Sequence, residues 1–106
     1  MAQSEIIELL QLYIQLLNAA GFNIQKAFLY GSFARNEANN DSDIDIMLVS
    51  EKFDNNDIDV KAKAWKLTHK VDTRIEPFTI GLNNFYSGND SALLSHVKKE
   101  GIEIAF

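Results

Sequence analysis

Two aspartates separated by one residue, Asp43 and Asp45, stand at the start of an otherwise apolar run. If this run is a strand, alternation places both carboxylates side by side on one face, together with Met47 and Val49. Their mutual repulsion and the cost of dehydrating them are hard to justify unless a cation or a hydrogen-bond donor compensates. Mg²⁺ prefers oxygen ligands and often uses one or two carboxylates plus substrate phosphates and water. The pair therefore predicts a site for a divalent metal.

A plainer interpretation is a solvated turn over residues 41–43, with Asp45 at the end of an exposed strand. A calcium-binding loop is another alternative, because alternating aspartates are its first ligands. The rest of that pattern is absent, since Ile46 occupies the position that needs glycine and Lys52 the position that needs a bidentate glutamate. For an isolated Asp-Ile-Asp triplet the solvated turn is the more frequent outcome, so the metal site needs support from elsewhere.

A second chemical feature precedes the aspartates, where the apolar run 27–30 leads into Gly31 and Ser32. A glycine lets phosphate oxygens approach the backbone, and free amide hydrogens at the start of a helical turn attract anions. The Ser32 hydroxyl adds a donor, and Arg35, three residues on, would lie on the same face of that turn. Such a turn is weak evidence for phosphate binding when it stands alone.

Periodicity indicates the elements that must position these residues. Apolar residues at helical spacing predict a helix from about residue 5 to 20, with Ser4 able to cap its start and Gly21 at its end. The short apolar run 27–30 and the longer β-prone run 44–49 are predicted strands. The chemical residues therefore lie in and around the connection between two neighbouring strands.

Three further elements follow in the second half of the chain. Helical spacing predicts a helix over 57–69, and alternation predicts a strand over 71–80, in which Pro77 indicates an edge position or a bulge. A last helix is predicted over 91–100, stopped by Gly101. This order of elements indicates an α/β or α+β domain with a small sheet.

The composition is that of an ordinary soluble protein, with 46% hydrophobic and 24% charged residues among 106. A chain of this length fits one domain, which we expect to span residues 1–106. The net charge of −5 disfavours a protein that neutralises nucleic-acid phosphates, so no direct nucleic-acid binding is predicted. No apolar stretch is long enough to span a bilayer, and the start lacks a basic signal-peptide region. We therefore expect a cytoplasmic protein without membrane contact.

Taken together, Gly31-Ser32 followed after ten intervening residues by Asp43-Ile44-Asp45 resembles the signature of the DNA polymerase β-like nucleotidyltransferase superfamily. That signature reads Gly-Ser, a short helix with Ala-Arg, then Ser-Asp-x-Asp. The matching positions are Gly31, Ser32, Ala34, Arg35, Ala38, Ser42, Asp43 and Asp45. The chain is most similar in its brevity to the minimal nucleotidyltransferases of prokaryotes. One departure is Asn36, where many members carry glycine, which leaves room for a different turn after Arg35.

The resemblance implies a small mixed β-sheet flanked by helices and a site for two Mg²⁺ ions held by Asp43, Asp45 and a third carboxylate. A later strand supplies this third group in the family. We favour Glu76, because related short sequences often read Ile-Glu-Pro at this point, as this chain does. Asp72 is the alternative, and its other interpretation is a turn residue paired with Arg74 or a nearby lysine.

The resemblance also implies a nucleotide site and a reaction. Gly31 and Ser32 would hold the β- and γ-phosphates of ATP, with Ser42 also on the nucleotide, and a nucleoside monophosphate, most simply AMP, would pass to an acceptor. Arg35 would either offset developing negative charge or brace the loop through Asp41 or Glu37.

The acceptor is open at the level of sequence. Minimal nucleotidyltransferases commonly act beside a small helical partner of the HEPN type, in toxin–antitoxin pairs where AMP is transferred onto the partner, and the resemblance implies the same here. The alternative is a non-catalytic module that binds and neutralises such a helical partner. Transfer to a small molecule such as an aminoglycoside is less favoured, because it needs an added helical domain to form the acceptor pocket.

Overall fold

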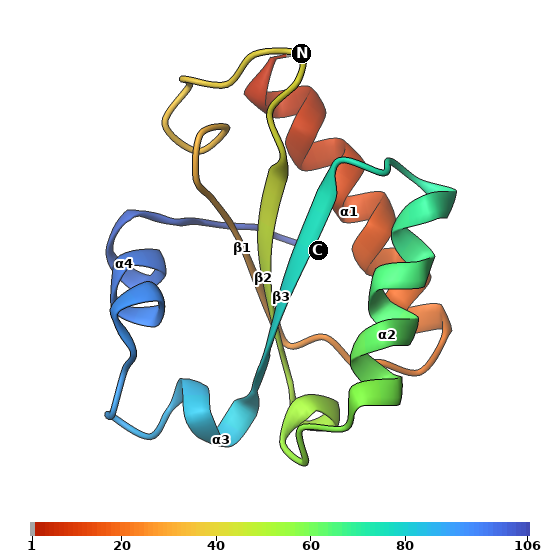
Figure 1. Cartoon of the computed structure of the whole chain (residues 1–106), viewed down its shortest axis with the longest axis vertical. Coiled ribbons are helices and arrows are strands. Elements are labelled where there is room, and N and C mark those ends of the chain that lie inside the picture. Colours follow the sequence, from red (N-terminus) through yellow and green to blue (C-terminus); the bar gives the residue numbers. More distant parts are fainter. Residues whose placement is uncertain (1) are drawn as a thin grey trace.

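The computed structural model describes residues 2–106, and Figure 1 shows their helices and strands. In chain order these are α1 (Gln3–Ala19), β1 (Lys26–Tyr30), β2 (Ile44–Ser50), α2 (Ile58–Leu67), β3 (Ile75–Gly81), α3 (Leu82–Phe85), α4 (Ala92–Glu100) and β4 (Ile102–Glu103). Two short 3₁₀ turns, η1 (Glu51–Phe53) and η2 (Thr68–Lys70), flank α2. The arrangement is α+β with one small sheet, as the sequence predicts.

The four strands form one mixed sheet in the order β3-β2-β1-β4. β1 pairs antiparallel with β2 and with β4, whereas β2 and β3 run parallel. The register places Tyr30 opposite Asp45, and Asp45 beside Glu76. β3 is an edge strand, which confirms the edge position that Pro77 indicates. A proline nitrogen carries no hydrogen and cannot donate to a neighbouring strand, so proline is tolerated where one side of the strand is unpaired.

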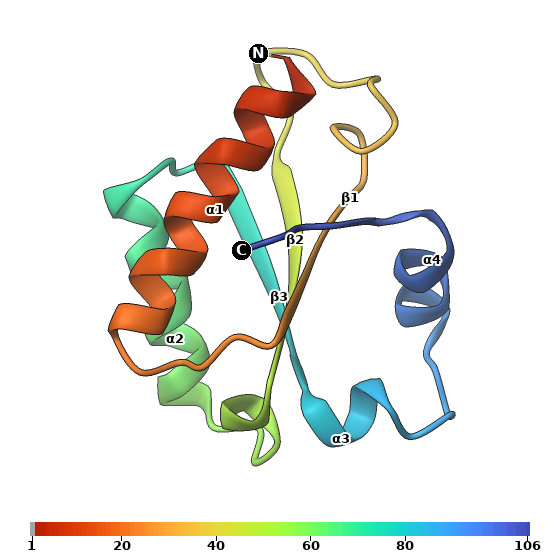
Figure 2. The same cartoon turned by 180° about the vertical axis from the view of Figure 1, so that it is seen from behind.

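Helices cover both faces of the sheet. α1 and α2 lie on one side and α3 and α4 on the other, as the two opposite views in Figures 1 and 2 show. Ile44, Ile46 and Leu48 of β2 join the core under α1 and α2, whereas Met47 and Val49 join the core under α3 and α4. β2 is therefore buried on both faces, and this explains why its sequence is an almost continuous apolar run.

The first helix begins two residues earlier than predicted. Its N-cap is Ala2, and Ser4 lies inside the first turn, so the prediction that Ser4 caps the helix is wrong. The Glu5 side chain takes over part of that task, since its Oε1 accepts a hydrogen bond from the Ala2 N–H at 3.0 Å. The predicted end is confirmed, because Gly21 has φ +91° and the Phe22 N–H bonds back to the Leu17 carbonyl.

The predicted strand over 71–80 is wrong at its start, because β3 begins only at Ile75. The Asp72 Oδ1 accepts the backbone N–H of Arg74 at 2.8 Å, and the Val71 N–H bonds to the Thr68 carbonyl. An aspartate that binds the backbone two residues on makes a turn, and this local bond competes with strand pairing. The alternation of residues 71–74 therefore does not correspond to a strand.

The two other predicted helices, α2 and α4, match their predictions to within a few residues, whereas α3 was not predicted. Asp57 caps α2, and Ser91 caps α4 through bonds to the backbone N–H groups of Asp59 and Leu94. Gly101 ends α4 as predicted, but with an extended backbone rather than a left-handed one. Among residues 2–106, none of the helices combines the length and the apolar character that crossing a bilayer requires.

Candidate active site

The glycine after β1 lies directly against an aspartate of β2. Gly31 has φ +78°, a backbone conformation that other residues rarely adopt, and a Cβ added to it would collide with the Asp45 carboxylate. Both facts require glycine at this position. The two chemical features of the sequence, the Gly-Ser turn and the aspartate pair, therefore meet in space at Gly31 and Asp45.

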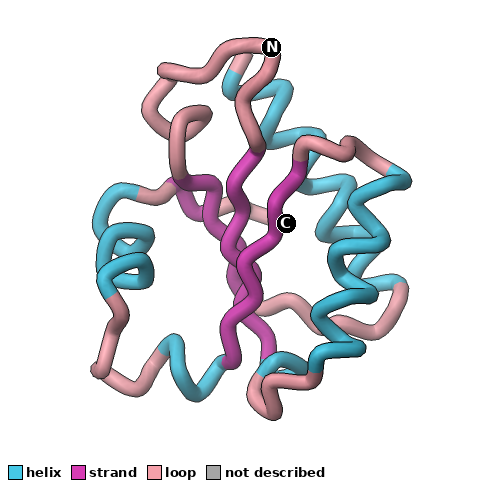
Figure 3. The backbone as a smooth tube through the Cα atoms, viewed as in Figure 1, coloured by secondary structure: helices cyan, strands magenta, loops and turns pink. Residues whose placement is uncertain are grey.

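The chain after Gly31 folds as a helical turn, without becoming a regular helix, within the β1–β2 loop (Figure 3). Its backbone bonds join the Arg35 N–H to the Gly31 carbonyl at 3.3 Å and the Glu37 N–H to the Ser32 carbonyl at 2.9 Å. The Ser32 hydroxyl makes no hydrogen bond within the described residues. This hydroxyl and the first amides of the turn are therefore available to an anion.

The turn is anchored by two residues that sequence reasoning missed. Phe33 is buried and belongs to the core under α1 and α2. Gln3, in the first turn of α1, donates its amide hydrogens to the carbonyls of Phe33 and Ala34 at 3.0 and 3.3 Å. The large apolar side chain of Phe33 in an otherwise small and polar turn was the available signal for this anchor. Together these contacts fix the turn to the rest of the fold.

Asn36 has a left-handed backbone conformation, which glycine adopts readily. Its φ is +56°, in the left-handed region that asparagine tolerates better than most residues. Asparagine in place of glycine at this position therefore does not require a different turn after Arg35.

Three acidic side chains interact around the beginning of β2. Asp45 and Glu76 are neighbours across the β2–β3 pair and share a face of the sheet, while Asp43 is exposed and immediately precedes β2. Burial raises the pKa of Asp45, the Asp43 carboxylate raises it further, and Arg35 opposes both effects. Desolvation raises the pKa of Glu76, followed by the Asp43 and Asp45 carboxylates and a hydrogen bond with Asp43. The structure therefore brings these three predicted residues together.

The donor set suits a hard divalent cation, since it consists of carboxylate oxygens that disfavour one another's charge. Among residues 2–106, no group of three or more acidic, histidine or cysteine side chains already has its donor atoms gathered around a common point. A cation between the carboxylates would remove this repulsion, which is the electrostatic reason for considering a metal here.

Asp72 is held away from this acidic group by Arg74. Its Oδ2 lies 2.8 Å from the Arg74 Nη2 and its Oδ1 lies 3.1 Å from the Nε. The hydrogen bond from the Arg74 side chain lowers the pKa of Asp72, with smaller contributions from the backbone bond and the charge of Arg74. Asp72 thus has the geometry of a paired turn residue, and Glu76 is the acidic residue beside Asp45.

The two remaining predicted residues make local contacts. The Arg35 Nε lies 3.1 Å from the Glu37 Oε2, and both side chains are largely exposed. This ion pair corresponds to the alternative in which Arg35 braces the loop through Glu37. The Ser42 Oγ accepts the Asn39 N–H at 3.0 Å and thereby shapes the turn that enters β2. Arg35 still acts on the site at a distance, because its charge favours the ionised form of Asp45.

Tyr30 joins the site although sequence reasoning did not select it. It stands opposite Asp45 across the β1–β2 pair and is partly buried. Burial, Asp45 and Glu76, in that order, raise the pKa of Tyr30 to about 12. The phenol is therefore a neutral hydrogen-bond donor beside the acidic group at neutral pH. The sequence places Tyr30 before Gly31, but its position beside Asp45 follows only from the register of β1 and β2.

Two comparisons with known proteins bear on the family and the fold of the chain. The sequence profile of the family described as "Polymerase beta, Nucleotidyltransferase" matches residues 5–105. A protein from Sulfolobus solfataricus, whose crystal structure is described as that of a candidate nucleotidyltransferase, is similar in fold, with a TM-score of 0.64 and 13% identity. That match covers 96% of this chain and 81% of the other. None of the curated proteins compared with the chain matches it.

The family match spans almost the whole sequence, and the structural likeness independently supports the fold. Family and fold together support a role in nucleotidyl transfer. The chain belongs to the polymerase beta family of nucleotidyltransferases.

Proposed function

We propose that the chain transfers AMP from ATP to a hydroxyl of an acceptor and releases pyrophosphate. The observation that carries this proposal is the contact between the Asp45 carboxylate and the Gly31 backbone. This contact places an acidic group suited to cations directly beside a turn with free phosphate-binding donors. A triphosphate with its bound metal needs carboxylates for the metal and hydrogen-bond donors for the phosphates at the same place.

In this proposal Asp43, Asp45 and Glu76 would hold two Mg²⁺ ions. When bound, these ions would neutralise charge on the triphosphate and acidify the acceptor hydroxyl. The three carboxylates are suited to that task because Asp45 and Glu76 lie on adjacent strands, Asp43 immediately precedes β2, and the three already interact electrostatically. Tyr30 would donate a hydrogen bond into the same group and help to orient it.

The remaining residues bind and orient the nucleotide. The Ser32 hydroxyl and the first amides of the turn would bind the β- and γ-phosphates, and the absence of a side chain at Gly31 would let them come close. The acceptor oxygen forms a bond to the α-phosphorus, and the bond from that phosphorus to pyrophosphate breaks. The acceptor proton passes to a carboxylate oxygen of Glu76, which stands beside Asp45 across the β2–β3 pair.

The acceptor belongs to a partner protein in this proposal. The support is the resemblance to minimal nucleotidyltransferases, whose partners are small helical proteins of the HEPN type. Modification of such a partner would make the chain the antitoxin of a toxin–antitoxin pair.

The test is transfer of labelled AMP from ATP to the protein encoded beside this chain, measured by mass spectrometry in the presence of Mg²⁺. We expect one added adenylyl group, and a loss of about 100-fold or more in rate for Asp43→Asn with Asp45→Asn and for Glu76→Gln. The matched control is Asp41→Asn, which removes an exposed aspartate of the same loop. Equal rates for the control and the site variants would contradict the proposal. Neutralisation of the partner without any transfer would favour the non-catalytic binding module.

A further inference from the structure

The outer edge of β3 carries backbone groups that no other strand of residues 2–106 pairs with. The Arg74 carbonyl accepts the Ile44 N–H at 2.9 Å, so the backbone of residue 74 faces β2. Consecutive residues of a strand direct their backbone groups to opposite sides, and therefore Pro77 and Thr79 face outward. Pro77 fits this assignment because it has no N–H to offer to β2.

These outward groups make no hydrogen bonds within the described part of the chain. No backbone group of residues 76–80 takes part in a bond outside the sheet. The Pro77 carbonyl and both backbone groups of Thr79 are therefore free to pair with an added strand. Recognition of an extended peptide in this way takes its affinity from backbone hydrogen bonds and its selectivity from neighbouring side-chain pockets.

A cleft of about 650 Å³ lies along the same edge. Its walls come from β3, from the segment between η1 and the start of α2, and from the connection between α3 and α4; they include Phe53, Lys61, Phe78, Asn84, Asn89 and Leu94. This volume lies within the range of roughly 300–1,000 Å³ that is usual for ligand sites. The cleft therefore has room for several residues of a bound chain.

Phe78 joins the cleft to the proposed active site. It is 44% exposed, although it is a large apolar residue. It lies two residues after Glu76, on the same face of β3, at a distance of about 7 Å along the strand. A peptide in the cleft would cover Phe78 and extend toward Glu76.

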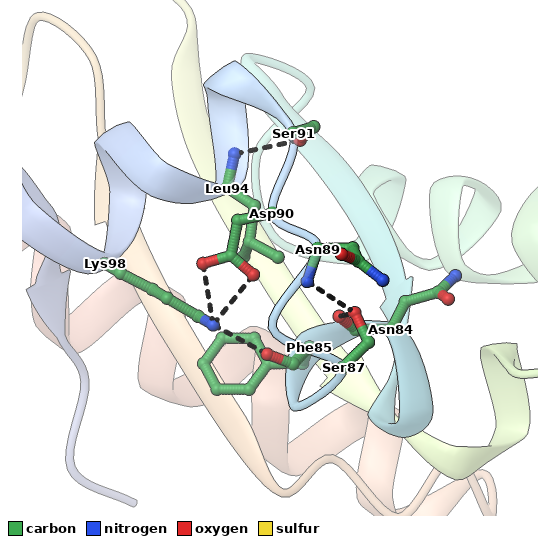
Figure 4. Close-up of polar contacts among 8 residues, drawn as sticks. All are labelled: Asn84, Phe85, Ser87, Asn89, Asp90, Ser91, Leu94 and Lys98. Carbon is green, nitrogen blue, oxygen red and sulfur yellow. Dashed lines mark hydrogen bonds and ion pairs between the residues drawn. The ribbon is translucent and has the colours of Figure 1, made fainter.

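The wall opposite β3 is held in place by Lys98. Its Nζ donates to the Phe85 carbonyl at 2.7 Å, pairs with Asp90 at 3.0 Å and lies 4.6 Å from the centre of the Phe85 ring (Figure 4). Ser91 caps the following helix by accepting the Leu94 N–H. The α3–α4 connection is thus a braced wall, and binding need not first order it.

Two amide side chains on this wall have no hydrogen bonds among the described residues. Figure 4 shows the amide groups of Asn84 and Asn89 without contacts to the residues around them, although the Asn89 backbone N–H bonds to Ser87. Each primary amide offers a donor and an acceptor, which matches the two groups of a peptide bond. They lie across the cleft from the free edge of β3.

From these contacts we infer that the cleft binds an extended peptide segment of the acceptor protein as an added strand on β3. Asn84 and Asn89 bond to polar groups of that segment, and its hydroxyl side chain lies beside Glu76. The identification of the segment as the acceptor rests on the proposed function, whereas the peptide site itself does not.

The direct test is a titration of the isotopically labelled full chain followed by amide chemical shifts in NMR spectra. The probe is a pool of terminally blocked peptides of about eight residues, with a central serine, threonine or tyrosine and randomised flanks. We expect shifts at residues 78–81 and 84–91 and in the side-chain amides of Asn84 and Asn89. A pool with N-methyl groups at every peptide bond has no N–H donor on either edge, cannot form a ladder with β3 and should leave the spectrum unchanged. Equal binding of the methylated pool, shifts elsewhere, or no shifts would overturn the inference.

Variants separate this site from the nucleotide site. Asn84→Ala with Asn89→Ala is compared with Asn83→Ala, the exposed neighbour that does not line the cleft. Phe78→Ser is compared with Leu12→Ser, since Leu12 is similarly exposed at 49% but belongs to α1. We expect about tenfold or greater loss of peptide affinity only in the cleft variants, with stabilisation by Mg²⁺ and ATP unchanged.

The two proposals fail in distinguishable ways. Peptide binding in the cleft without any AMP transfer would overturn the proposed function and leave the peptide site intact. AMP transfer with the same KM for the acceptor protein in the cleft variants would overturn this inference and leave the proposed function intact.

Discussion

At the scale of single residues, the contact between Gly31 and Asp45 carries most of the functional argument. A glycine is often conserved for its backbone freedom, but here the space for a Cβ is also taken by a carboxylate. Backbone conformation and close packing act together at one position. The site is therefore more sensitive to a methyl group at Gly31 than to most changes around it.

Gly31→Ala should reduce both stability and activity. A residue other than glycine at φ +78° costs about 1–3 kcal/mol, and the added methyl displaces the Asp45 carboxylate. Gly88→Ala is the matched control, since Gly88 has φ +83° and open space around it. Urea unfolding and AMP transfer measure the two effects. If the control lost as much activity as Gly31→Ala, displacement of Asp45 would not be the cause.

Asp72 should stabilise the fold in a pH-dependent way. Arg74 lowers the pKa of Asp72 in the folded state, so the stabilisation is complete above the unfolded value near 3.9 and is lost as the pH falls through the folded value. Asp72→Asn should therefore cost about 1 kcal/mol near pH 7 and almost nothing near pH 2. Urea unfolding at both pH values measures this difference. A cost that stays constant with pH would show that the charge of Asp72 is not responsible.

At the scale of elements, three strands and one helix combine to make the site. β1 supplies Tyr30, β2 supplies Asp45 and β3 supplies Glu76, and their register sets these three side chains in a row across one face. α1 contributes indirectly, because Gln3 donates hydrogen bonds to two carbonyls of the turn after Gly31. The position of the turn that is proposed to bind phosphate thus depends on a helix that contributes no catalytic group.

Gln3→Ala should loosen this turn without unfolding the protein. The loss of two hydrogen bonds to carbonyls costs about 1 kcal/mol of stability, and a more mobile turn should raise the KM for ATP several-fold. Gln15→Ala changes an exposed glutamine of the same helix and should leave that KM unchanged. Hydrogen exchange of the amides of residues 35–37 provides an independent measurement. Unchanged exchange together with an unchanged KM would contradict this anchoring role.

At the scale of the whole molecule, the proposed function requires an acidic chain to accept an anionic nucleotide. The net charge of −5 opposes the approach of a triphosphate, and three acidic side chains at the site add to this repulsion. Cations bound with the nucleotide would reverse the local charge. Binding of nucleotide and binding of metal should therefore be coupled.

Mg²⁺ and ATP together should stabilise the protein more than either does alone. A ligand at about 100 times its Kd adds about 2.7 kcal/mol, which raises the Tm of a domain of this size by about 10 °C. Asp43→Asn with Asp45→Asn should abolish this rise. Asp41→Asn with Asp59→Asn makes the same change in net charge and should retain it. An equal rise in both double variants would indicate nonspecific screening, and thermal unfolding distinguishes the two outcomes.

Local patterns predicted most of the fold. The apolar spacing of α1, α2 and α4 and the strand character of β1 and β2 follow from side-chain periodicity, which acts over a few residues. The wrong predictions concern the ends of helices and strands, where a single hydrogen bond decides at which residue the element begins. Ser4 does not cap α1, and the bond between Asp72 and the Arg74 backbone delays the start of β3. Short elements such as α3 and β4 have too few residues for a periodic signal.

The sequence by itself determined that a Gly-Ser turn is followed by two closely spaced aspartates, and that the strand after them is apolar. Both features depend on residues close together in the chain. Only the tertiary structure decided that Asp45 packs against Gly31, that Glu76 rather than Asp72 stands beside it, and that Tyr30 joins the group. The cleft beside β3 likewise appears only in three dimensions. The physical reason is register: which distant residues face one another depends on how strands align, and no local pattern encodes that alignment.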